Sequence, residues 1–116
     1  MGDPASIGPE IACKTFASDK IYGICRPILV GDAEVMEQAA RIAGTNLKIR
    51  AVSQMSEAKF QIGSMDVFDL GNVKLSRLKM GKVSAMAGHA AFEAIRKVIE
   101  LALDKKVQAT VTGAPL

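Results

Sequence analysis

Between 87 and 103 the chain places apolar residues at the three- and four-residue steps of an amphipathic helix. Ser84 stands before this stretch in the position of an N-cap. A second helix is predicted over 33–43, with Asp32 as its cap and Gly44 as a left-handed stop. A third is predicted over 9–17, because proline fits the first helical turn and the acid of Glu10 suits the positive end of the helix dipole.

Shorter apolar runs between these helices predict strands. The run at 27–32 is apolar and ends in a turn, which is typical of a buried strand. Residues 47–52 alternate apolar and polar positions, so we expect a half-buried strand nearer an edge of the sheet. A weaker pattern predicts a strand at 65–70, and a last strand is predicted at 107–111. The glycine-containing stretch 71–82 is predicted to be a loop or an irregular ribbon.

Alternating strands and helices predict an α/β fold, a three-layer sandwich lobe with a mainly parallel sheet. The 116 residues suit a single domain, 1–116. Only 4% of the residues are aromatic and 49% are apolar, so the core must consist of small and aliphatic side chains. The opening turn has no strand before it and the final predicted strand has no helix after it, so we expect a partial domain, incomplete at both ends.

The charged residues exclude some classes of partner. A net charge of +3 is spread along the chain and gives no indication of nucleic-acid binding. One basic cluster has two interpretations, a contact to a phosphate group of a substrate or cofactor and a solvated face. It consists of Lys74, Arg77, Lys79 and Lys82.

The cysteines and the apolar runs bear on the cellular location. Cys13 and Cys25 form no C-x-x-C pair and are interpreted as small buried residues in a reducing compartment. No apolar run approaches the roughly 20 residues that a membrane helix needs, and no signal peptide is recognisable. We therefore expect a cytoplasmic protein with no membrane contact.

The opening segment MGDPASIGPE is the best candidate for a ligand site. Two glycines and two prolines fix a tight turn, and the helix behind it presents backbone N–H groups that suit a phosphate or carboxylate. The candidate cofactor-binding residues are Gly2, Asp3 and Gly8. A purely structural interpretation remains open, in which the glycines only let the turn pack against a neighbouring strand.

The remaining polar residues give no catalytic or metal-binding site. His89 is the single histidine of the chain, whereas a metal site needs three or four converging ligands, so we interpret it as a residue of the helix surface. Asp66 and Asp69 are three residues apart on a strand and therefore lie on opposite faces, which makes joint acid–base chemistry impossible. We interpret both as ordinary strand-end or loop acids.

Four segments taken in order resemble one known family, that of the 4-hydroxythreonine-4-phosphate dehydrogenases and the related phospho-threonate dehydrogenases. They are MGDPASIGPE at 1–10, RPILVGD at 26–32, GKVS at 81–84 with Ala87 and Gly88, and VTGAP at 111–115. The resemblance covers the whole chain but about the first third of a family member. One departure is Ser6, where the family usually has glycine.

The resemblance implies a fold like that of isocitrate and isopropylmalate dehydrogenases. It also implies oxidation of the secondary alcohol of a phosphorylated hydroxy acid by NAD or NADP, with decarboxylation able to follow. A divalent metal such as Zn, Mg or Co would polarise the alcohol oxygen and be bound by histidines outside this chain, in a homodimer. The chain alone would be inactive.

Two alternatives keep other functions open. Phosphate acyltransferases share a comparable architecture and a similar strand end at 27–32, and they need neither metal nor nicotinamide. A freestanding small-ligand or protein-interaction module would need no further polypeptide. The opening motif disfavours the first alternative, and the unfinished ends disfavour the second.

Overall fold

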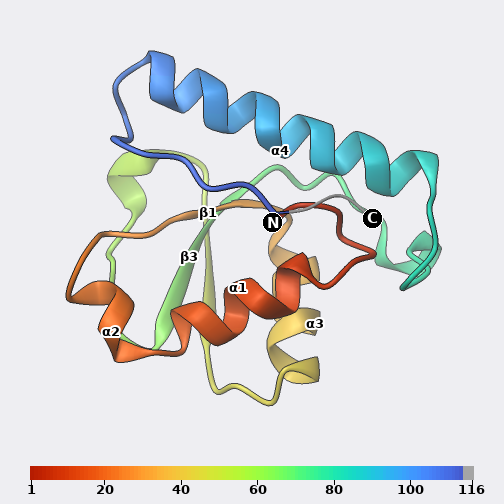
Figure 1. Ribbon diagram of the computed structural model, residues 1–116, viewed down its shortest axis with the longest axis horizontal. Coiled ribbons are helices and arrows are strands. Elements are labelled where there is room, and N and C mark those ends of the chain that lie inside the picture. The colour runs from red at the N-terminus through yellow and green to blue at the C-terminus, as the bar shows by residue number, and fades with distance from the viewer. Residues whose placement is uncertain (114–116) are drawn as a thin grey trace.

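The computed structural model describes residues 1–113 as three layers, a parallel sheet between two layers of helices (Figure 1). The strands are β1 (Leu29–Gly31), β2 (Lys48–Val52) and β3 (Ser64–Asp69), in the order β1-β3-β2. Both neighbouring pairs are parallel, with Val30 opposite Phe68 and Arg50 opposite Asp66. The predicted α/β sandwich with a parallel sheet is therefore confirmed.

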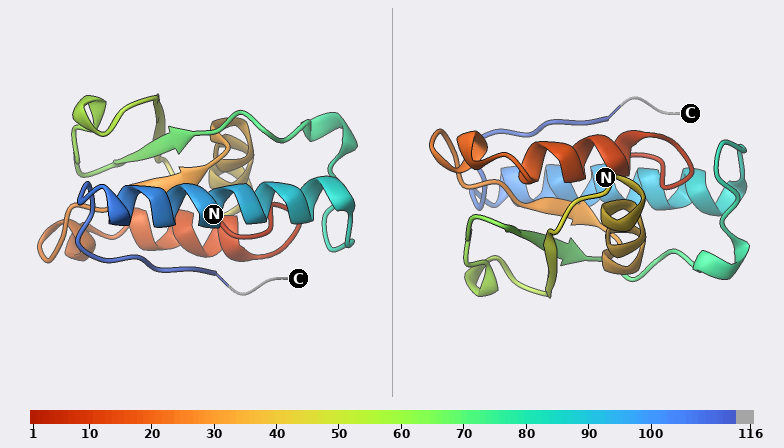
Figure 2. Two further views of the ribbon diagram at one scale, coloured as in Figure 1. Left: turned by 90° about the horizontal axis from the view of Figure 1, so that it is seen from above. Right: turned by 90° about the horizontal axis from the view of Figure 1, so that it is seen from below.

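The helices cover the sheet unequally. On one face lie α1 (Gly8–Phe16) and α3 (Ala33–Ile42), which also pack against each other, while α4 (Ala85–Leu103) crosses the other face (Figure 2). Alternation along the strands separates two cores. Leu29 and Val67 face α1 and α3, whereas Val30 and Phe68 face α4.

Short elements complete the fold. A single-turn helix, α2 (Asp19–Tyr22), follows α1 and was not predicted, because four residues are too few for a periodic pattern. Two 3₁₀ turns, η1 (Met55–Glu57) and η2 (Leu75–Arg77), lie in the connections before β3 and before α4. The second lies within 71–82, the stretch predicted to be irregular.

Local signals placed the helix ends correctly. The Asp32 carboxylate accepts a hydrogen bond from the N–H of Val35, and the Ser84 hydroxyl accepts one from the N–H of Ala87. Gly44 follows α3 with a φ of +71°, the left-handed conformation that ends a helix. Each cap and the stop involve residues only a few positions apart, and the sequence alone is therefore enough to predict these helix ends.

The prediction of a final strand at 107–111 is wrong for the described chain. Residues 107–113 form no strand, and Val111 is 93% exposed. A strand needs a hydrogen-bonded neighbour, and at the outer edge of β1 the backbone nitrogen of Met1 already donates to the Val30 carbonyl over 3.1 Å. The segment therefore passes the sheet without joining it.

The two cysteines differ in exposure, which corrects the expectation that both are buried. Cys13 is fully buried between α1 and α3, and its burial, with the charge of Glu10, raises the pKa of its thiol to about 11. Cys25 lies after α2 and is exposed. We expect a disulfide-exchange reagent such as dithiobis(nitrobenzoate) to react with one thiol of the folded chain and with both after unfolding.

The control for this labelling is Cys25→Ser, which should abolish the fast reaction and leave only the thiol that unfolding exposes. The total rise in absorbance at 412 nm in native buffer gives the number of reactive thiols, because each thiol releases one chromophore. The rate of this rise shows how readily they react. A fast native thiol remaining in Cys25→Ser would contradict the described packing of Cys13.

Candidate functional site

Several polar and glycine-containing segments meet at the carboxyl ends of β1 and β3. In open parallel sheets, ligands bind outside the carboxyl ends of the strands, where loops leave the sheet on the same side. The opening loop reaches this edge, because the Met1 side chain lies on Gly31, the last residue of β1. A Cβ at Gly31 would come within 2.6 Å of the Met1 Cβ, so the loop and β1 fit only without a side chain there.

The opening loop folds around a buried acid. The Asp3 carboxylate accepts a hydrogen bond of 2.8 Å from the N–H of Ala5, and the Asp3 carbonyl accepts one of 3.1 Å from the N–H of Ser6. Asp3 is 7% exposed. The Asp3 carboxylate thus stabilises the turn in which Asp3 itself lies. Ser6 is not among the residues of positive φ, so the turn accepts a side chain where the resembling family has glycine.

The two glycines of the loop are required by the backbone. Gly2 has a φ of +75°, a conformation that side chains disfavour. A Cβ at Gly8 would lie 2.5 Å from the Met1 carbonyl oxygen, closer than a Cβ atom approaches another atom in proteins. The chain therefore crosses itself at Gly8, and this crossing sets the point at which α1 begins.

The start of α1 keeps its backbone N–H groups without a side-chain acceptor. Its N-cap is Ile7, which makes no side-chain cap hydrogen bond, in contrast to Asp32 and Ser84 at the starts of α3 and α4. Pro9 lies in the first turn and has no N–H, so it removes one of the donors that need a partner. The site can therefore offer backbone N–H groups and the positive end of a dipole to an anion.

The loop is tied to two segments that are distant in sequence. The N–H of Gly81 donates to the Ala5 carbonyl over 2.7 Å. Gly113 lies beside Gly2, with its Cα 3.7 Å from where a Gly2 Cβ would be. Figure 1 shows the final described residues returning to the start of the chain. The described parts of the segments that carried the family resemblance therefore meet at one edge.

Acidic residues link the ends of β1 and β3. One Asp32 oxygen caps α3, and the other accepts a hydrogen bond of 3.0 Å from the N–H of Val73. Asp69 accepts hydrogen bonds from the N–H groups of Ala33 and Gly71. These carboxylates fix the loops around the edge.

Asn72, just beyond β3, was missed by the sequence analysis. Its amide nitrogen and oxygen are both buried, and neither has a hydrogen-bond partner among the described residues. An unpaired buried amide costs about 1 to 3 kcal/mol. Its position three residues after Asp69, the last residue of a parallel strand, was the signal that could have identified it.

Burial also affects the charge of the chain's first group. The pKa of the Met1 ammonium is lowered to about 6 by its removal from water. At neutral pH the nitrogen is therefore mainly an uncharged amine, which reduces the cost of placing it against the Val30 carbonyl. The Met1 nitrogen therefore contributes little positive charge to this edge above pH 7.

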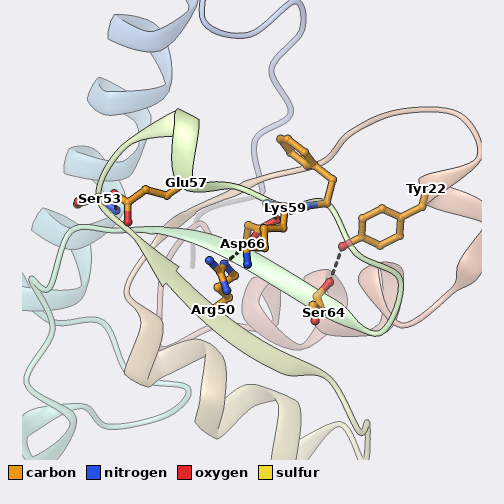
Figure 3. A network of polar contacts seen from close by, with 8 residues as sticks. Tyr22, Arg50, Ser53, Glu57, Lys59, Ser64 and Asp66 are labelled. Carbon is orange, nitrogen blue, oxygen red and sulfur yellow. Dashed lines mark hydrogen bonds and ion pairs between the residues drawn. The ribbon is translucent and has the colours of Figure 1, made fainter.

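A polar network at β2 and β3 is structural (Figure 3). The Asp66 carboxylate is 1% exposed and accepts hydrogen bonds from the N–H groups of Lys59 and Phe60, the latter over 2.8 Å. Its other oxygen lies 3.7 Å from Arg50 Nε, an ion pair without a hydrogen bond. Asp66 and Asp69 accept hydrogen bonds from different segments. The prediction that Asp66 is an ordinary strand-end or loop acid is wrong, because its carboxylate is buried and holds the loop before β3.

Tyr22 extends this network to the start of β3, where its hydroxyl donates to the Ser64 carbonyl. Burial, and then the charge of Asp66, raises the pKa of the Tyr22 hydroxyl. Because Ser64 opens β3, the contact lies away from the carboxyl edge. It joins α2 to the sheet and takes no part in the candidate site.

The other predicted residues stay outside the site. His89 lies on the surface of α4, with Nε2 3.5 Å from Glu93. The four basic residues Lys74, Arg77, Lys79 and Lys82 are exposed. Within residues 1–113 no three His, Cys, Asp or Glu side chains approach one another closely enough to hold a metal ion, and no helix is long and apolar enough to cross a membrane.

Known proteins with this fold and loop arrangement place the chain in a class and then in a family. The fold is that of α/β dehydrogenases: a 4-hydroxythreonine-4-phosphate dehydrogenase from Burkholderia phymatum has 40% sequence identity and a TM-score of 0.89, over 92% of this chain and 32% of its own. The corresponding structure from Klebsiella pneumoniae has 34% identity and a TM-score of 0.90, over 100% of this chain and 35% of its own. The family model described as pyridoxal phosphate biosynthetic protein PdxA matches residues 23–116, and the chain belongs to this family.

Curated relatives agree with this assignment. A protein of Symbiobacterium thermophilum, provisionally named D-threonate 4-phosphate dehydrogenase, is 48% identical over 113 residues, which are 97% of this chain and 34% of the relative. A protein of Clostridium botulinum with the same provisional name is 43% identical over 112 residues. The chain thus spans about a third of the length of the relatives it matches.

Proposed function

We propose that these residues form the N-terminal part of a two-lobed dehydrogenase that oxidises the secondary alcohol of a phosphorylated hydroxy acid. The observation that carries the proposal is the 48% identity, over nearly the whole chain, to a relative provisionally named as such an enzyme. Membership of the PdxA family supports it. The family assignment also disfavours both a phosphate acyltransferase and a freestanding module.

The substrate is 4-phosphooxy-threonine or 4-phospho-threonate in this proposal. The solved relatives are named for 4-hydroxythreonine 4-phosphate and the curated ones for D-threonate 4-phosphate, so both compounds belong in the first assay. NAD or NADP would accept the hydride, and decarboxylation of the resulting β-keto acid could follow. The complete enzyme would be a cytoplasmic homodimer.

The residues of this chain do not fit a metal site, so we place the divalent metal, Zn, Mg or Co, on residues outside it. Within residues 1–113 the acids nearest the candidate edge already have structural partners, since Asp3, Asp32 and Asp69 accept backbone hydrogen bonds. A bound divalent metal would polarise the alcohol oxygen. No step of the chemistry is assigned to these carboxylates, and the chain alone would be inactive.

The opening loop contributes to cofactor binding in this proposal. Gly2 and Gly8 allow the backbone to approach a ligand closely, and the start of α1 provides N–H groups without a side-chain cap. Asp3 acts indirectly, by holding the turn. The loop would thus orient an anionic group of the cofactor and exclude water from one side of it.

The test is turnover by the full-length protein. We expect reduction of NAD or NADP, followed at 340 nm, with at least one of the two phosphorylated substrates, loss of this activity with a chelator, and recovery on adding Zn²⁺, Mg²⁺ or Co²⁺. Unphosphorylated threonate is the matched control and should give a much lower kcat/KM, because it lacks the charged group. Absence of chelator-sensitive reduction with both phosphorylated compounds would overturn the proposal.

A further inference from the structure

The longest helix carries a second apolar face that nothing in the described chain covers. Residues Ala87, Ala90, Ala94 and Leu101 are the buried side of α4. Four large apolar side chains of the same helix are nevertheless exposed. They are Phe92 at 60%, Ile95 at 43%, Ile99 at 53% and Leu103 at 77%.

The exposed side chains lie in one continuous stripe. Positions 88, 92, 95, 99 and 102 follow alternating steps of four and three residues, the spacing with which one helix meets another along its length. All five residues, Gly88, Phe92, Ile95, Ile99 and Ala102, are exposed, and with Leu103 we call them the outer face of α4. In the view from above, α4 lies in front of the sheet and of α1 (Figure 2).

The charged residues of α4 are confined to a narrow strip beside this face. Arg96 lies 3.9 Å from Glu93 and 3.4 Å from Glu100, and His89 lies 3.5 Å from Glu93. These charges are therefore paired with one another along the helix. A helix bordered by water on its outer side would carry polar residues across that whole side, whereas α4 is polar only along the strip.

The area of the outer face argues against a separate protein as its partner. A complete side chain of this size has an area of roughly 200 Å². The four side chains are 43 to 77% exposed, and a stable interface needs roughly 800 Å² from each partner. The exposed area of these four side chains is therefore little more than half of what such an interface needs. A segment of the same polypeptide needs no such area, because it is already tethered. The relatives supply such polypeptide, since this chain spans 34% of their length.

We propose that the outer face of α4 is the docking site for a helix of the remaining polypeptide, from the two-thirds of the relatives' length that lies outside residues 1–116. The docked helix packs along α4 with apolar residues in the same alternating spacing. The small residues Gly88 and Ala102 let the two backbones approach, and Phe92, Ile95 and Ile99 fill the space between them. This contact joins the two parts of the protein independently of any catalytic role.

A photo-crosslinking experiment on the full-length protein tests the proposal. Ile99 is replaced by the photoreactive residue p-benzoylphenylalanine, and in a matched control the same residue replaces Glu100, the neighbouring position on the charged strip. After irradiation, peptide mass spectrometry identifies the crosslinked partner. We expect the probe at 99 to crosslink within one chain to residues outside 1–116, at least 10-fold more than the probe at 100.

Circular dichroism and size-exclusion chromatography show first that each variant is folded. Because Ile99 can be sensitive to a larger side chain, the experiment is repeated with the probe at Phe92, where an aromatic residue already stands. Crosslinks from both probes to a second copy of the chain, seen at twice the mass, would overturn the proposal. So would equal, weak crosslinking from the face and from the strip.

Discussion

Replacing Asp32 by alanine should lower the free energy of unfolding by about 3 kcal/mol, the largest loss that we expect from a single polar side chain. The Asp32 carboxylate is 2% exposed and accepts 3.0 Å hydrogen bonds from the N–H groups of Val35 and Val73. Alanine removes both acceptors. The start of α3 then loses its cap, and the Val73 N–H loses its acceptor in a buried position.

Urea denaturation of the 116-residue chain, followed by circular dichroism, measures this effect. Ser84→Ala is the matched control, because Ser84 caps α4 through one hydrogen bond and should cost only about 1 kcal/mol. Asp32→Asn should fall between the two, since its amide group would present a donor to one of the two N–H groups. An Asp32→Ala loss no larger than that of Ser84→Ala would show that the contact to Val73 contributes nothing.

Gly8→Ala should destabilise the chain by about 2 kcal/mol and displace the opening loop. The new methyl group would lie 2.5 Å from the Met1 carbonyl oxygen, which belongs to backbone and cannot turn away as a flexible side chain can. Either α1 begins later or the loop moves off Gly31. Both changes disrupt the carboxyl edge at which we place the cofactor.

The control is Gly88→Ala in the 116-residue chain, where the added methyl group meets nothing within 4 Å. Because glycine is a poor helix former, this substitution should stabilise α4 by about 0.5 to 1 kcal/mol. The midpoint temperature of thermal unfolding should therefore fall for Gly8→Ala and rise for Gly88→Ala. A Gly8→Ala chain as stable as the unsubstituted one would contradict the close crossing described here.

Features that depend on neighbouring residues were predictable from the sequence. The caps Asp32 and Ser84 and the stop at Gly44 each act within a few positions of the chain. The central position of β3 could not be predicted in this way. Its sequence pattern was weaker than those of β1 and β2, and its place between these two strands is set by burial on both faces.

The errors concern contacts between distant residues. The segment 107–111 has the composition of a strand, but pairing depends on what lies beside it, and Met1 meets the edge of β1 instead. Asp66 holds a loop six and seven residues earlier in the chain, a contact that helix or strand spacing does not reveal. The candidate loop residues were identified by their turn chemistry, whereas their contacts to Gly81 and Gly113 emerged only from the fold.

The hydrogen bond from Gly81 to Ala5 affects the order in which the chain can fold as it is made. Ala5 leaves the ribosome before Gly81, which is synthesised 76 residues later, and Gly113 follows later still. Closing so long a loop costs entropy that only the finished sheet can offset. The opening loop should therefore be among the last of these parts to become protected from hydrogen exchange, even though it is translated before its partners.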